Sequence, residues 1–209
     1  MSAGIIHQLY AGMAPWAALS ILLLGRNPYL SRTRTIGSLL LAFFLLRIPV
    51  EIGGTNYWHL FAWCRTLEMN PSFTFTGLLC VALWQRLSGK SIFRAEDWRA
   101  AWVVGALAAF ALYPMGLGLT HLDPYTWGWG PALPIAISVI ACVLLFAGNR
   151  FGIILILPLA GSLLHLQESG NFWDALIDPL YSAVSLGGCV YLSLRRQRSS
   201  ISSCNHLEF

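Results

Sequence analysis

The residues best suited to do chemistry in this sequence lie between positions 165 and 178, in its densest run of polar side chains. His165, Glu168 and Asp174 can hold a proton, coordinate a metal or bind a polar substrate group. A general acid or base needs a carboxyl group whose pKa has been raised by burial. Because Glu168 lies next to the apolar end of the preceding stretch, we predict that it is the titrating acid or base. Asp174 is then its electrostatic or metal-binding partner, and His165 is a polar ligand.

The same segment contains the start of a helix. Asp178 precedes Pro179, and an Asp N-cap followed by Pro at the first helical position is a common way to begin a helix. We therefore assign Asp178 to capping. Capping also remains the alternative for Glu168 and Asp174, because it uses the same residue types as catalysis.

Aromatic and polar residues in this segment and around positions 121–130 are candidates for binding a substrate. Indole rings stack on sugars and attract cationic headgroups, while carboxylates accept hydrogen bonds. The alternative is an ordinary aromatic belt at the depth of lipid headgroups. The predicted substrate-binding residues are Trp173, Trp127, Asn171, His121 and Asp123.

Three histidines suggest a metal site. His59, His121 and His165 fall in three different gaps between apolar stretches, each within a few residues of a carboxylate. Three imidazoles with an open coordination position suit a catalytic zinc. The sequence has no HExxH motif, so the site would depend on tertiary packing. A divalent metal is the only cofactor that we predict, and single histidines bonded to local groups are the alternative.

A second pair of candidate catalytic residues lies in an apolar run. Arg47 and Glu51 are four residues apart, which places them on one face of a helix. Ionisable residues in such a segment are costly, and they usually face a bundle interior or a water-filled cavity, which makes them functional candidates. The alternative is a structural pair in which Glu51 holds Arg47.

The composition predicts which elements position these residues. Hydrophobic residues make up 56% of the 209 residues and charged residues 11%, compared with about a quarter charged in soluble domains. We predict an all-α integral membrane protein, with a single bundle of about seven transmembrane helices in residues 1–198 and a disordered tail in residues 199–209. The predicted spans are 9–24, 36–52, 73–87, 100–119, a fifth that begins at Pro131 or Pro134 and ends at Gly148, 151–166 and 179–195.

The charges predict an orientation. Eleven of the thirteen Lys and Arg residues fall in alternate gaps between the apolar stretches, and cytoplasmic loops retain positive charge. The N-terminus is therefore predicted outside and the C-terminus inside, in the cell inner membrane, with a periplasmic-facing polar site. Anionic lipid next to the basic loops explains them without a nucleic-acid partner.

The predicted function rests on polar groups that would lie at the depth of the lipid headgroups, beside apolar helices. We expect a membrane-embedded hydrolase or transferase that acts on a lipid-linked glycan or a lipid headgroup, with membrane lipids as partners. One alternative is a small-solute permease or substrate-binding transporter subunit. Another is a non-catalytic assembly partner or a haem or quinone anchor. The residue types allow an enzyme without requiring one, and they leave the oligomeric state open.

Overall fold

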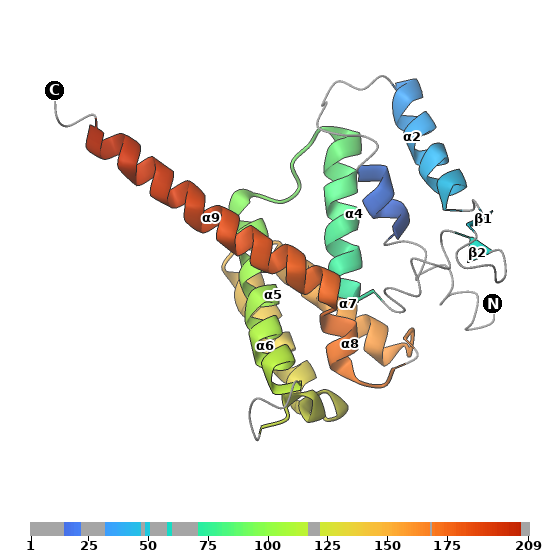
Figure 1. Ribbon diagram of the computed structural model, residues 1–209. Helices are drawn as coiled ribbons and strands as arrows, with labels where there is room; N and C mark the ends of the chain where they lie inside the picture. Colours follow the sequence, from blue (N-terminus) through green and yellow to red (C-terminus); the bar gives the residue numbers. More distant parts are fainter. Residues whose placement is uncertain are drawn as a thin grey trace.

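Most of the described residues are helical, and α4 to α9 pack together as a bundle (Figure 1). The computed structural model describes residues 15–21, 32–46, 49–50, 58–59, 71–116, 122–167 and 169–205. Residues 15–21 are helical. The labelled elements are α2 (Arg32–Leu45), β1 (Pro49–Val50), β2 (Trp58–His59), α4 (Phe73–Ser88), α5 (Ala95–Gly116), the 3-10 helix η1 (Pro124–Trp129), α6 (Ala132–Phe146), α7 (Phe151–Leu163), α8 (Phe172–Leu176) and α9 (Pro179–Asn205).

Local capping chemistry decides where several helices begin and end. Ser72 begins α4, where its Oγ accepts a hydrogen bond from the main-chain N–H of Phe75 at 3.1 Å. Gly89 ends the same helix at a φ of 66°, a conformation that glycine adopts without steric cost. Gly148 ends α6 in the same way, at a φ of 73°, and makes the short turn into α7.

The core lies where α4, α5, α7, α8 and α9 meet. α5 packs against α9, α6 pairs with α7, and α4 packs against α7. Figure 1 shows α9 crossing α5 and extending beyond the other helices. The larger buried side chains of the core are Phe73, Leu78, Phe93, Phe151, Leu155, Phe172, Trp173, Leu176 and Tyr181. The site at the end of the bundle rests on this core.

The prediction of membrane-spanning helices is wrong. Within the described parts of the chain, no helix combines the length and the apolar composition needed to cross a bilayer. About 20 residues are needed, whereas α4, α6 and α7 have 16, 15 and 13. The 22-residue α5 contains Glu96 and Asp97 in its first turn, and the 27-residue α9 runs through Arg195 into a polar end. This finding overturns the integral membrane fold class, the seven spans with their orientation, and the multi-pass inner-membrane localisation.

One smaller prediction about the backbone is also wrong. The helix predicted to hold Arg47 and Glu51 on one face ends at Leu45, and Pro49–Val50 instead pairs as a short antiparallel strand with Trp58–His59. Proline lacks the N–H that a continuing helix needs. Arg47 and Glu51 themselves lie outside the described residues. α9 continues as a helix to Asn205, into the tail that the sequence predicts as disordered, and residues 206–209 of that tail lie outside the described residues.

Candidate functional site

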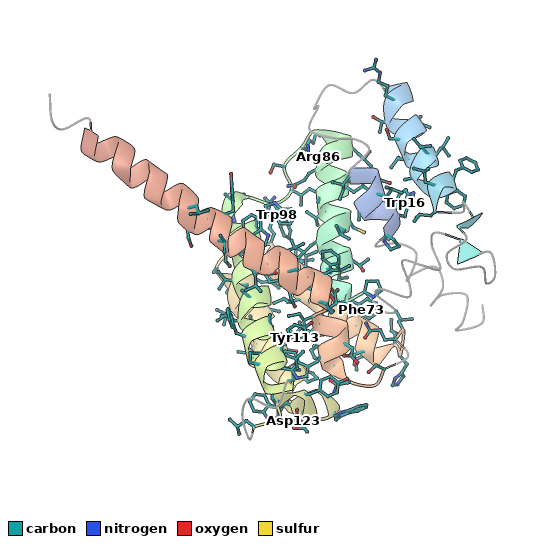
Figure 2. The ribbon with its side chains drawn as sticks, in the orientation of Figure 1. Trp16, Phe73, Arg86, Trp98, Tyr113 and Asp123 are labelled. Carbon is teal, nitrogen blue, oxygen red and sulfur yellow. The ribbon has the colours of Figure 1, made fainter. Side chains whose placement is uncertain are left out.

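The candidate site lies at one end of the bundle, where η1 packs against α8. η1 also contacts the ends of α5 and α6. Figure 2 shows Tyr113 and Asp123 toward this end, and Arg86 and Trp98 toward the opposite end. We call it the η1/α8 site and define it by Tyr125, Trp127, Trp129 and Asp174.

Asp123 shapes the start of η1. Its Oδ1 accepts a hydrogen bond from the main-chain N–H of Tyr125 at 3.0 Å, and its main-chain oxygen accepts one from Thr126 Oγ1 at 2.6 Å. Pro124 follows at the first position of the helix, where a missing N–H costs nothing. The Asp123 side chain, predicted to bind substrate, therefore has a defined structural role as the cap.

Hydrogen bonds from the side chains of Asn171 and Trp173 connect α8 to η1. Asn171 Oδ1 caps α8 by accepting from the main-chain N–H of Trp173 at 3.0 Å, while its Nδ2 donates to the Tyr125 carbonyl at 3.0 Å. Trp173 Nε1 donates to the Pro124 carbonyl at 2.7 Å. Gly128 lies so close to Asn171 Oδ1 that a Cβ there would overlap it. This contact explains the glycine.

The placement of these two residues gives each a structural role, and their predicted substrate-binding role stays a prediction. Asn171 is 1% exposed and Trp173 is 4% exposed, so neither side chain presents a surface on which a substrate could stack. Buried polar atoms need partners, and both residues find them in the η1 backbone. We assign Asn171 and Trp173 to positioning η1.

The reactive feature of the site is the Tyr125–Asp174 pair. Tyr125 Oη donates to Asp174, with distances of 3.2 Å to Oδ2 and 3.4 Å to Oδ1. Gln167 Nε2 holds the main-chain oxygen of Asp174 at 3.0 Å. Burial and the neighbouring Asp174 charge raise the pKa of Tyr125, so the phenol remains a proton donor. Asp174 is only partly buried, and its carboxylate retains lone pairs that can accept from a ligand.

Two exposed indole rings, those of Trp127 and Trp129, lie in the same 3-10 helix as Tyr125. Trp127 is 54% exposed and Trp129 is 64% exposed. The ring of Trp129 meets Tyr125 edge to face, with centroids 6.5 Å apart and an interplanar angle of 85°. The site thus offers a carboxylate acceptor held by Tyr125, whose ring meets the exposed ring of Trp129. Substrate stacking by Trp127 stays a prediction, and the exposure of its ring is compatible with it.

His165 occupies a helix cap. Its φ of 49° is left-handed, and its N–H donates to the Ser162 carbonyl at 3.1 Å while Leu166 N–H donates to the Gly161 carbonyl at 3.0 Å. These two bonds form a Schellman motif that ends α7. The backbone conformation of His165 is therefore explained by the cap, and its predicted catalytic and metal-binding roles stay untested.

The other predicted residues cannot be placed. Glu168, His121, Arg47 and Glu51 lie outside the described residues, as does the side chain of His59. In the described part of the chain, no group of three His, Cys, Asp or Glu residues could hold a metal ion. The three-histidine metal site, two of whose members are not described, remains a prediction.

The capping role of Asp178 is confirmed. Its Oδ1 accepts from the Tyr181 N–H at 2.6 Å and its Oδ2 from the Ser72 N–H at 2.7 Å. One buried carboxylate thus joins the start of α9 to the residue that caps α4.

Sequence reasoning missed Tyr125, Trp129 and Gln167 as members of the site. Tyr125 and Trp129 lie in the aromatic segment that was interpreted through Trp127 and Asp123, and the Asp123-Pro124 cap was the signal that the segment folds tightly. Gln167 carries no such signal, because an amide side chain is common on any surface. Comparison with protein-family models, curated proteins and solved structures finds no match, so the geometry alone supports the interpretation of the site.

Proposed function

We propose that this protein binds the polar group of a lipid-linked or headgroup substrate at the η1/α8 site and acts on it as a hydrolase or transferase. The observation that carries the proposal is the partly buried Asp174 carboxylate, which is held by Tyr125. The exposed ring of Trp129 contacts Tyr125, and the exposed ring of Trp127 belongs to the same 3-10 helix. The arrangement offers both a charge and stacking surfaces to a ligand.

The polar group that suits this site is a sugar or a quaternary ammonium. A sugar presents hydroxyls to the carboxylate and its C–H face to an indole ring. A quaternary ammonium is attracted to the ring face and to the negative charge. A sugar hydroxyl can donate to the free lone pairs of Asp174, because Tyr125 donates only one proton. A quaternary ammonium has no N–H and uses only the negative charge of the carboxylate.

The surface next to the site suits the apolar part of such a substrate. α6 begins at Ala132, three residues after Trp129. It exposes Ile135, Val139 and Val143 on its outer side. Exposed apolar surface of this kind is typical of binding sites for other molecules rather than of an ordinary water-facing helix. A ligand that joins a polar group to a hydrocarbon chain can therefore use both the site and α6.

Hydrolysis or group transfer needs a second ionisable group beside Asp174. Glu168 is the residue that the sequence predicts as acid or base, and it directly follows Gln167, whose side chain fixes the α8 backbone at Asp174. In this proposal Glu168 transfers the proton, while Asp174 orients the polar group of the substrate.

Two single-chain amphiphiles test the binding step. Dodecylmaltoside and dodecyltrimethylammonium can be titrated below their micelle concentrations by calorimetry against wild-type protein, Asp174→Asn and Tyr125→Phe. Asp174→Asn should weaken binding of the ammonium compound by about tenfold or more, since the attraction between two unit charges about 4 Å apart is on the order of 1–4 kcal/mol near a protein surface. Tyr125→Phe should weaken binding less, because it frees the carboxylate to move but keeps its charge.

Asp123→Asn is the matched control, because it removes a nearby exposed charge while keeping an N-cap acceptor. Equal affinities for Asp174→Asn and Asp123→Asn would contradict the proposed binding site. The catalytic step is tested by turnover of radiolabelled glycolipids with Glu168→Gln. Full turnover by that variant at wild-type melting temperature would rule out its role as acid or base.

A further inference from the structure

The end of the bundle opposite the η1/α8 site is basic. Residues 86–99 and 148–150 contain Arg86, Lys90, Arg94, Arg99 and Arg150 against two carboxylates, Glu96 and Asp97. Figure 2 shows Arg86 and Trp98 at this end, far from Asp123. The balance of charge favours an anionic partner.

Both carboxylates of this end are already engaged. Asp97 is fully buried and accepts from the main-chain N–H groups of Arg94 at 2.7 Å and Arg150 at 2.8 Å. Glu96 Oε1 pairs with Arg94 Nη1 at 2.8 Å. The Asp97 carboxylate therefore connects the start of α5 to the turn that precedes α7, and the Glu96 carboxylate is paired with Arg94. Among the described residues, neither carboxylate forms an ion pair with Arg99.

Arg99 stands at the head of an apolar stripe on α5. Val103, Leu107 and Phe110 follow it at intervals of four, four and three residues, which places all four side chains on one face of the helix. Arg99 is exposed, and the three apolar side chains are 46%, 63% and 65% exposed. The other side of α5 packs against α9. The exposed face thus presents a cation followed by hydrocarbon.

The stripe, together with Arg99, matches a ligand that has one charged end and a hydrocarbon chain. At 1.5 Å per residue, Val103 to Phe110 covers roughly 10 Å along the axis. A guanidinium binds phosphate oxygens through two parallel N–H donors, and an alkyl chain needs only apolar contact. A hydrocarbon chain needs no hydrogen-bond partners on this face of α5. A protein partner, in contrast, contributes polar groups of its own to a typical interface.

We propose that this face of α5 binds an anionic phospholipid, with the phosphate at Arg99 and an acyl chain along Val103, Leu107 and Phe110. The site is separate from the η1/α8 site and uses different residues.

Native mass spectrometry of the full chain in dodecylmaltoside micelles tests the proposal. The micelles contain either phosphatidylglycerol or zwitterionic phosphatidylcholine as the probe. Wild-type protein should retain phosphatidylglycerol in preference to phosphatidylcholine. Arg99→Gln should lower phosphatidylglycerol affinity by about tenfold, the effect of losing one charge-assisted contact, and should abolish the preference.

Lys90→Gln is the matched control, because it removes an exposed cation from the same end without touching the stripe. Leu107→Ser changes an exposed side chain and should weaken both lipids, since it removes chain contact without altering charge. Equal phosphatidylglycerol binding by Arg99→Gln and Lys90→Gln would overturn the assignment to Arg99. Unchanged lipid binding by Leu107→Ser would contradict the assignment of the acyl chain to the stripe and would favour a protein partner on this face. Asp174→Asn should bind phosphatidylglycerol normally, so failure of one proposal is distinguishable from failure of the other.

Discussion

His165 and Gly148 occupy the same position in two consecutive helix caps. Each lies directly after the C-cap residue, of α7 and α6 respectively, and each has a left-handed φ, 49° for His165 and 73° for Gly148. In both caps the next residue donates back to the helix, Leu166 to Gly161 and Asn149 to Leu144. Glycine is the usual residue there, so α7 carries strain that α6 avoids.

His165→Gly should therefore stabilise the protein. The left-handed conformation costs a residue with a Cβ about 1–2 kcal/mol, and part of the gain is lost because glycine makes the unfolded chain more flexible. A net gain of about 0.5–1 kcal/mol corresponds to a rise of about 1–4 °C in melting temperature for a chain of this size. Gly148→Ala should lower the melting temperature. A lower melting temperature for His165→Gly would show that the histidine side chain itself holds this end of the chain.

Removal of the Asp178 carboxylate should destabilise the protein strongly. Asp178→Ala leaves the N–H groups of Ser72 and Tyr181 without their acceptor in a buried position. Two such losses should cost about 2–4 kcal/mol, measured as the free energy of unfolding in urea. Asp123→Ala removes a cap from an exposed 3-10 helix and should cost about 1 kcal/mol or less. Equal effects of the two substitutions would contradict the joining role of Asp178.

Neighbouring glycines of α9 should respond oppositely to alanine. A Cβ at Gly188 would overlap ring atoms of Trp102, whereas a Cβ at Gly187 would have no neighbour within 4 Å. Gly188→Ala should cost about 1–3 kcal/mol through overpacking. Gly187→Ala should gain about 0.5–1 kcal/mol, because alanine favours a helix. Thermal unfolding of both variants checks the packing of α9 on α5, and a destabilising Gly187→Ala would show that this side of α9 is also covered.

Tyr181 should make the protein sensitive to alkali. Its hydroxyl is buried and donates to the Ala101 carbonyl at 2.7 Å, and burial raises its pKa well above the ordinary value of 10.0. Above pH 10 the unfolded chain loses this proton while the folded protein keeps it. Stability should therefore fall as the pH rises, by up to about 1.4 kcal/mol per pH unit for one proton.

Tyr181→Phe is the control for this effect. It should lower stability at pH 7 by about 1 kcal/mol through loss of the hydrogen bond, yet show a shallower decline between pH 10 and pH 12. Urea unfolding at a series of pH values measures both. An equally steep decline in the variant would place the alkaline sensitivity in other groups.

Local chemistry let the sequence determine where many elements lie. The segment predicted at 73–87 is helical as α4, and Asp178 caps α9 as expected, because a cap involves residues that are neighbours in the chain. The sequence also located a polar region around Asp174 and an aromatic one around Trp127, since both depend on composition alone.

Tertiary structure decided what those residues do. Asn171 and Trp173 have the residue types of a binding site, yet packing of η1 on α8 buries them and leaves Trp127 and Trp129 outside. The partner of Asp174 is Tyr125, 49 residues away, and no spacing rule predicts a contact over that distance. The apolar stretch 151–166 is helical only to Leu163, because the Schellman motif at His165 ends α7 there. Hydropathy sums over such turns, whereas the backbone hydrogen bonds of a helix stop at them.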